Sequence, residues 1–144
     1  MNANNKEEKD LFELAETCIK ENKFEDAENY YKLILDNEPE NLEALYMSGF
    51  LCMKNNSYKN ALEYFNKFIN LNNDNPFVYE YMGMMDETNR TEYFNKAIEI
   101  NDNIKIMKRD YSRYIYIAFK SYEMGEYDIS LNYTNYIYNV RQIN

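Results

Sequence analysis

Small residues recur at a nearly fixed interval along most of this chain. Ala15, Gly49, Gly83 and Ala118 follow one another at intervals of 34, 34 and 35 residues. Around each of them, apolar residues are three and four positions apart, the spacing of one face of an α-helix. A second small-residue series keeps the same step, at Ala27, Ala61 and Ser130. Two such series in step predict a stack of helical hairpins, because helices that cross closely need small residues at the crossing.

Proline and asparagine mark where the predicted helices start and stop. Pro39 ends the second helix of the first hairpin, since proline cannot continue a helix. Asn41 and Ser57 are suitable first caps for the next two helices, and Asn75 followed by Pro76 is a third start signal. The predicted repeats are residues 8–41, 42–75, 76–110 and 111–144.

The chain length favours one domain. Residues 1–9 are polar and charged without helical periodicity, so we predict a disordered N-terminal segment there. Asp10 then provides a plausible helix cap, and we expect a single domain over residues 10–144.

The third repeat is irregular. Phe65 and Phe94 occupy equivalent positions but are only 29 residues apart, five fewer than the period. The first helix of the third hairpin is therefore predicted to be about one turn shorter and to end around Asp86 or Glu87. A similar number of extra residues precedes the fourth repeat. We expect them to lengthen its first helix at the N-terminal end, through Ile104 and Met107.

The pattern resembles the tetratricopeptide repeat. Its consensus has a large apolar residue, Leu-Gly, an aromatic residue at the start of the second helix, Ala and a further aromatic residue. In the second copy, these positions are Leu45, Gly49, Tyr58, Ala61 and Phe65. The resemblance covers about residues 8–144 in four copies. It implies an all-α, right-handed superhelical solenoid of antiparallel helix hairpins with about eight helices.

In this family, the first helices of the hairpins line a concave groove that holds peptides or helices. Glu16 keeps the first copy polar, but most groove positions, assigned by register, are aromatic or apolar. We interpret them as a partner-binding groove for an apolar peptide or an amphipathic helix. The alternative is that they pack against neighbouring copies or against a terminus that folds back onto them. The positions are Phe12, Ile19, Tyr46, Phe50, Met53, Phe77, Met84, Ile115, Phe119 and Tyr122.

Charge and composition narrow the choice of partners. The chain has 16 Lys and Arg against 25 Asp and Glu, a net charge of −9, which disfavours nucleic acid and anionic membrane surfaces. It has no histidine, so the commonest general base and metal ligand is absent. We therefore expect a non-enzymatic protein-interaction module without cofactor or metal. Acidic residues such as Glu16 and Glu43 favour a ligand with basic flanks.

The two cysteines and the lack of an export signal in the sequence lead us to expect a cytoplasmic protein. Cys18 and Cys52 are one repeat apart, so stacked helices would keep them too far apart for a disulfide. No stretch is apolar enough for a signal peptide or a membrane span. Both cysteines are expected to be small core residues in a reducing compartment.

The last predicted helix departs from the family pattern. Ser130 and Thr134 replace the usual Ala and aromatic residue. We therefore expect an apolar flank at the end of the stack, where a terminal repeat normally needs a polar face. A homodimer through that flank is one alternative function, and a chaperone for a hydrophobic client is another. The flank consists of Ile129, Tyr133, Tyr136 and Val140.

Overall fold

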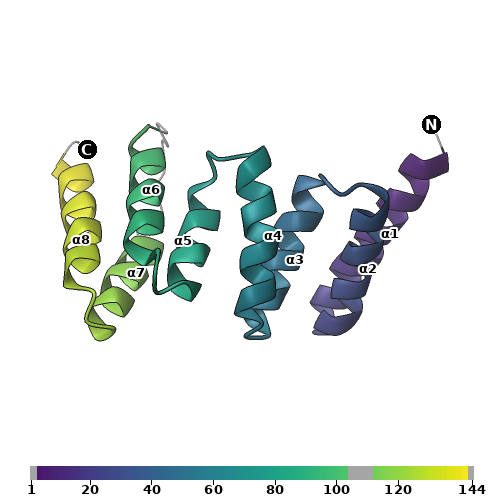
Figure 1. Cartoon of the computed structure of the whole chain (residues 1–144), viewed down its shortest axis with the longest axis horizontal. Coiled ribbons are helices and arrows are strands. Elements are labelled where there is room, and N and C mark those ends of the chain that lie inside the picture. The colour runs from purple at the N-terminus through teal and green to yellow at the C-terminus, as the bar shows by residue number, and fades with distance from the viewer. Residues whose placement is uncertain (1–2, 104–111, 143–144) are drawn as a thin grey trace. The chain divides into compact units, whose positions relative to one another are not determined.

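The computed structural model describes the backbone of residues 3–103 and 112–142, and this part of the chain consists of helices joined by turns. Consecutive helices pair as antiparallel hairpins (Figure 1). The all-α prediction is therefore confirmed. The helices are α1 (Ala3–Lys20), α2 (Phe24–Asn37), α3 (Leu42–Lys54), α4 (Tyr58–Leu71), α5 (Pro76–Met85), α6 (Arg90–Asn103), α7 (Ser112–Glu123) and α8 (Tyr127–Gln142).

The chain divides into two compact units, each of two hairpins. The N-terminal unit, Met1–Asp74, contains α1 to α4, and the C-terminal unit, Asn75–Asn144, contains α5 to α8. In the N-terminal unit, each helix packs against the next one along the chain. In the C-terminal unit, α5 packs on α6 and α7 packs on α8, and α8 also contacts α6.

The recurring small residues lie where the two helices of each hairpin cross. Ala15, Gly49, Gly83 and Ala118 are all buried. A Cβ atom on Gly49 would lie 2.6 Å from Cε1 of the Phe65 ring on the facing helix. A Cβ on Gly83 would lie 3.1 Å from the ring of Phe94. The crossing distance therefore requires small residues, as the repeat pattern predicted.

Three of the four hairpins use the same turn between their helices. Asn22, Asn56 and Gly125 have positive φ angles of 60°, 58° and 80°. The following residue closes each turn with an N–H that donates to a carbonyl five residues earlier, for example from Lys23 to Cys18 at 2.8 Å. This arrangement satisfies carbonyls that a helix end leaves unpaired.

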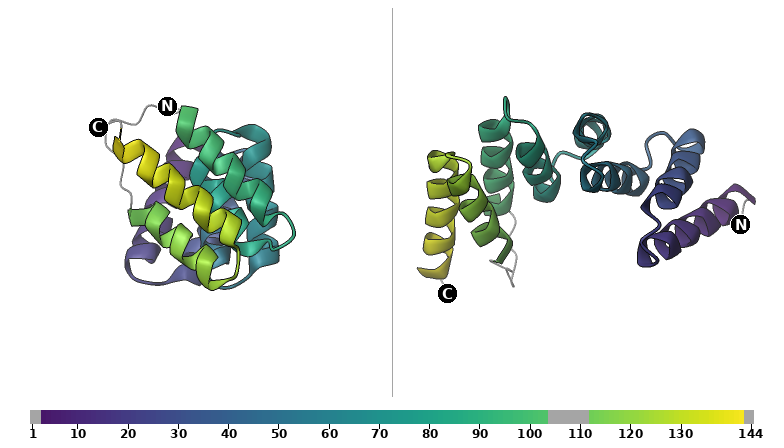
Figure 2. Two further views of the ribbon diagram at one scale, coloured as in Figure 1. Left: turned by 90° about the vertical axis from the view of Figure 1, so that its left-hand side faces the viewer. Right: turned by 90° about the horizontal axis from the view of Figure 1, so that it is seen from below.

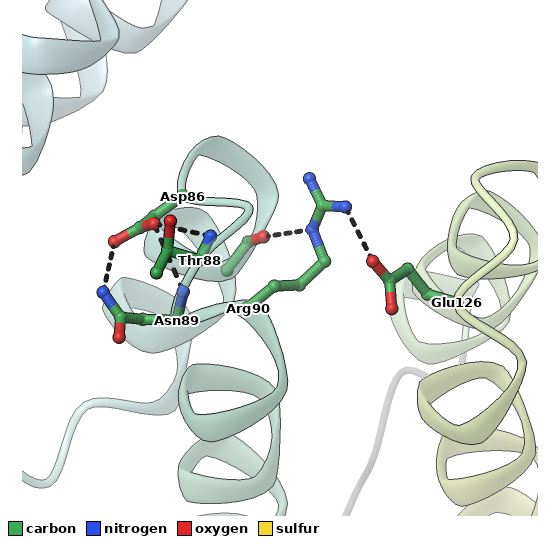
Figure 3. A network of polar contacts seen from close by, with 6 residues as sticks. Asp86, Thr88, Asn89, Arg90 and Glu126 are labelled. Atoms are coloured by element: carbon green, nitrogen blue, oxygen red, sulfur yellow. Dashed lines mark hydrogen bonds and ion pairs between the residues drawn. The ribbon is translucent and has the colours of Figure 1, made fainter.

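The third hairpin lacks this turn because α5 is short. It ends at Met85, as the irregular spacing predicted. The carboxylate of Asp86 closes the turn instead (Figure 3). It accepts from the backbone N–H groups of Thr88 and Asn89 at 3.0 and 3.3 Å, and from Nδ2 of Asn89 at 2.9 Å. These hydrogen bonds hold the pKa of Asp86 below its ordinary value.

Arg90 links this turn to the fourth hairpin. Its Nε donates to the carbonyl oxygen of Gly83 at 3.0 Å, near the end of α5. Its Nη1 lies 3.2 Å from Oε1 of Glu126, in the turn between α7 and α8 (Figure 3). The Arg90 side chain is almost fully buried. One guanidinium group thus caps α5 and positions the hairpin that carries α7.

The prediction of disorder over residues 1–9 is wrong for residues 3–9, which form the first turns of α1. Their anchor is Asn41, the first cap of α3. Its Oδ1 accepts from the N–H of Ala44 at 3.0 Å, and its Nδ2 donates to Glu8 at 3.0 Å and to Glu38 at 3.3 Å. Partial burial and the neighbouring Glu38 carboxylate raise the pKa of Glu8. The sequence showed a polar segment without an apolar face, whereas the structure adds a long-range hydrogen bond to Glu8 within it.

The residues expected to form an open apolar flank on α8 face the core instead. Ile129, Tyr133 and Tyr136 are at most 7% exposed, so their prediction as an open dimer surface is wrong. They face α6 and α7: the ring of Tyr133 lies 5.7 Å from that of Phe94, and Tyr136 lies 5.5 Å from Tyr114. The side chain of Val140 is outside the described residues, as is the expected extension through Ile104 and Met107.

The other expected helix starts differ in detail. Asn75 caps α5 as predicted, because its Oδ1 accepts from the N–H groups of Phe77 and Val78, and Pro76 follows it. Ser57 occupies the first-cap position of α4, but its side chain makes no capping hydrogen bond. None of the helices described is both long and apolar enough to cross a membrane.

Replacing Gly49 by alanine tests the crossing distance. We expect Gly49→Ala to lower the free energy of unfolding by about 1–3 kcal/mol, because the buried Phe65 ring cannot move away. Gly83→Ala should cost less, since its Cβ would have 0.5 Å more room. Urea denaturation measures both. In a Phe65→Leu background the cost of Gly49→Ala should shrink, and equal costs in the two backgrounds would contradict the account.

Replacing Asp86 tests the turn of the third hairpin. We expect Asp86→Ala to lower the free energy of unfolding by about 1–2 kcal/mol at pH 7, because three N–H groups lose a charged acceptor. The folded-state pKa of Asp86 is lowered, so its stabilisation is present above the unfolded-state value near 3.8 and is lost as the pH falls through the folded-state pKa. Denaturation at pH 7 and at steps below pH 4 measures this. The exposed neighbour is the control: Glu87→Ala should change little. If Asp86→Ala lowered the free energy of unfolding by the same amount at every pH, this role of Asp86 would be contradicted.

Candidate protein-binding surface

The most open apolar surface among the predicted groove residues is on α7. Ile115, Phe119 and Tyr122 lie four and three positions apart, so they share one face of the helix. Their side chains are between 49% and 62% exposed. The opposite side of α7 is buried against α8, through residues such as Tyr114 and Ile117. We call Ile115, Phe119 and Tyr122 the α7 face.

The edges of the α7 face are defined by one ion pair and one aromatic contact. Nζ of Lys120 lies 2.8 Å from Oε2 of Glu123, and 5.8 Å from the centre of the Phe119 ring. The ring of Tyr122 meets that of Tyr127, at the start of α8, edge to face at 5.4 Å. The lysine charge is thus balanced locally, and the face itself is apolar.

The second hairpin carries a similar but more covered set on α3. Tyr46, Phe50 and Met53 have the same four-and-three spacing and are half-buried. The Tyr46 ring packs against Phe65 and Phe68, with ring centres 6.3 and 6.0 Å away. Tyr46 therefore contributes to the core of its own hairpin, and Phe50 and Met53 are the partly open members of this set.

The remaining predicted groove residues lie in varied surroundings. Phe12 and Ile19 are half-buried against the core around Ala15 and Tyr31, and Met84 packs on the core formed by α6, α7 and α8. Met84 thus packs between copies, the alternative given above, whereas the ring of Phe12 contacts Tyr31 of its own hairpin. Phe77 is exposed at the first turn of α5. A role in binding stays a prediction for all of them.

The sequence analysis missed an apolar stripe on α8. Tyr127, Leu131 and Tyr138 are among the most exposed large apolar side chains described. Their spacing of four and seven residues was visible in the sequence. It went unnoticed because α8 carries aromatic residues on several sides, and the family pattern directed attention to the wrong one.

The cysteines have the character of core residues. Cys52 is buried and Cys18 half-buried, and neither forms a disulfide. The Cys52 thiol donates to Oε1 of Glu28 at 3.6 Å, and burial together with that carboxylate raises its pKa to about 11. It is therefore protonated and a poor nucleophile at neutral pH. Within residues 3–103 and 112–142, no three His, Cys, Asp or Glu residues are grouped as metal ligands.

Two of the clefts in the N-terminal unit are lined largely by polar side chains. One, of about 280 Å³, is lined by polar side chains of α2, α3 and α4, including Glu28, Ser48 and Cys52. The other, of about 200 Å³, lies between α1 and the end of α2 and includes Glu8 and Glu38. Both are polar, so neither offers the apolar surface that the α7 face provides.

The fold and the repeat define the class of this protein as a helical-repeat protein. A family model described as tetratricopeptide repeat matches residues 11–41 and 42–75. The first two hairpins therefore match the tetratricopeptide repeat, as the sequence pattern predicted for these copies. Such repeats generally serve as protein-interaction scaffolds. No protein with a curated functional description matches the sequence.

Solved structures share the fold at low sequence identity. The crystal structure of MamA protein is similar over 94% of this chain and 73% of its own, with 21% identity and a TM-score of 0.73. A MamA structure from Desulfovibrio magneticus RS-1, starting at its residue 41, is 13% identical over 95% of this chain and 77% of its own, also with a TM-score of 0.73. The TPR domain of P58(IPK) is 14% identical over 90% of this chain and 40% of its own, with a TM-score of 0.52.

Two tyrosines of the fourth hairpin provide a matched test of surface against core. We expect Tyr122→Ala to change the free energy of unfolding by less than about 1 kcal/mol, because the side chain is mostly in solvent. Tyr133→Ala should cost about 3–5 kcal/mol, because it empties a fully buried site. Urea denaturation measures both. Similar costs for the two variants would show that the α7 face is part of the core.

Proposed function

We propose that this protein is a non-enzymatic interaction scaffold whose α7 face binds an apolar or amphipathic helical segment of a protein partner. The observation that carries the proposal is the exposure of Ile115, Phe119 and Tyr122 on one side of a helix whose other side is packed. Contiguous exposed apolar residues in a folded protein usually mark an interaction surface. A partner helix would present residues spaced three and four apart to them.

Phe50 and Met53 on α3 are a second, smaller surface of the same kind. They are half-buried, and Nζ of Lys54 lies 5.4 Å from the Phe50 ring centre, at the edge of the surface. A methionine can adapt its shape to different apolar partners because its side chain is flexible and polarisable. These two residues are therefore proposed as a separate candidate surface in the N-terminal unit.

The charge of the chain favours a ligand with basic flanks. Residues 1–74 contain fifteen acidic and eight basic side chains, and residues 75–144 contain ten and eight. Glu16 and Glu43, on the first helices of their hairpins, are both exposed. Such charges speed the encounter with a basic segment and select against an acidic one, and salt weakens both effects.

A panel of synthetic helical peptides tests this function. Each labelled peptide carries the same leucine stripe, flanked by lysines, by glutamates or by serines, and fluorescence anisotropy measures the dissociation constant for the full chain. We expect the lysine-flanked peptide to bind most tightly, with an advantage over the glutamate-flanked one that shrinks at high salt.

Variants then locate the binding surface. Phe119→Glu combined with Phe50→Glu should weaken binding of the lysine-flanked peptide by at least about 30-fold, as expected for central anchors of an interface. The matched control is Leu33→Glu, on an exposed apolar residue of α2. Unchanged binding by the double variant, with its helical circular dichroism intact, would show that the proposed surface is wrong.

A further inference from the structure

The outer side of α8 carries an apolar stripe that the proposed function does not use. Tyr127, Leu131, Thr134 and Tyr138 follow one another at intervals of four, three and four residues, which places them along one side of the helix. Tyr127, Leu131 and Tyr138 are 62%, 57% and 63% exposed. In the left-hand view of Figure 2, α8 crosses the front of its unit and no other helix of that unit lies over it. We call these four residues the α8 stripe.

The α8 stripe can be removed from water at little polar cost. The Thr134 hydroxyl already donates to the carbonyl oxygen of Ser130 at 2.8 Å, so it needs no outside partner. Asp128 is the only charged residue between positions 127 and 138. The spacing of four and three residues is that of the contact positions of a coiled coil.

The residue intervals along the α8 stripe, four, three and four, read the same from either end of the helix. If a second copy of α8 lies antiparallel across a two-fold axis, Tyr127 faces Tyr138 of the second copy, and Leu131 faces its Thr134. All four positions are then used, with large residues paired at both ends. A contact in which each copy uses the same patch is the commonest way in which identical chains form closed dimers.

We propose that the α8 stripe joins two copies of this chain as an antiparallel, two-fold symmetric dimer. The partner is a second copy because the spacing of the stripe is self-complementary. Such a contact also brings few like charges together, since Asp128 is the only charged residue between positions 127 and 138.

Head-to-tail association through α1 fits the observations less well. The exposed side of α1 would have to cover the stripe, and it consists largely of charged residues, which would lose their hydration in such a contact. It includes Lys6, Glu7, Lys9, Asp10, Glu13, Glu16 and Lys20. A symmetric contact through α8 leaves these charges in water and closes after two chains, so no filament follows from it.

Sedimentation velocity of the full chain tests the dimer. We expect a mass twice the 17.5 kDa of the monomer at tens of micromolar, falling to the monomer on dilution. Leu131→Lys should raise the dissociation constant at least about 30-fold, because it places two charges in the contact. Ile115→Lys is the matched control on the α7 face: it should remain dimeric while it loses the lysine-flanked peptide. A wild-type chain that stays monomeric at 100 μM overturns the proposal.

Cysteine crosslinking tests the register and does not depend on the charge variant folding. Leu131→Cys and Thr134→Cys chains are prepared separately, mixed and oxidised. The antiparallel pairing predicts that disulfides between the two variants exceed those within either variant by several-fold. The wild type, with Cys18 half-buried and Cys52 buried, provides the background. Crosslinks that form equally in all mixtures, or in none, overturn the proposed pairing, whatever the result of the peptide experiments.

Discussion

The close crossing of the two helices within each hairpin is the constraint on which the rest of this structure depends. At Gly49 the facing Phe65 ring leaves no room even for a methyl group, and Gly83 is nearly as tight against Phe94. These contacts fix the rotation of the first helix of each hairpin about its axis. Once that rotation is set, the residues on the face opposite the crossing are determined as well. The exposure of Ile115, Phe119 and Tyr122 follows from the way in which Ala118 and its neighbours are buried in the fourth hairpin.

The fourth hairpin shows how a departure from the repeat pattern moves an apolar surface. Tyr31 and Phe65, at equivalent positions of α2 and α4, are buried in their hairpins, but Thr134 of α8 is exposed and turned onto its own backbone. Without a large side chain there, α8 buries the neighbouring side, where Tyr133 packs between Phe94 and Tyr114. The outer side then consists of Tyr127, Leu131, Thr134 and Tyr138, which explains why the proposed dimer contact differs from the flank first expected.

Features set by local spacing could be predicted from the sequence, and features set by long-range contacts could not. The hairpins, the short α5 and the caps at Asn41 and Asn75 were read from periodicity and turn residues. The start of α1 is polar, and its long-range contact, a hydrogen bond from Asn41 to Glu8 33 residues away, leaves no apolar pattern in the sequence. No sequence pattern marked Arg90, which is buried and joins Gly83 and Glu126. Which side of α8 is buried was ambiguous in the sequence because both sides carry tyrosines. Only packing against α6 and α7 decides which side faces the core.

The central claim is that the C-terminal hairpin has two apolar surfaces with different partners, the α7 face for a partner helix and the α8 stripe for a second copy, which adjoin where Tyr122 contacts Tyr127. Native mass spectrometry of the full chain with the lysine-flanked peptide tests both surfaces in one measurement. The account predicts a complex of two chains and two peptides, formed without loss of the dimer. A monomer that binds one peptide, or a peptide that separates the two chains, would contradict it.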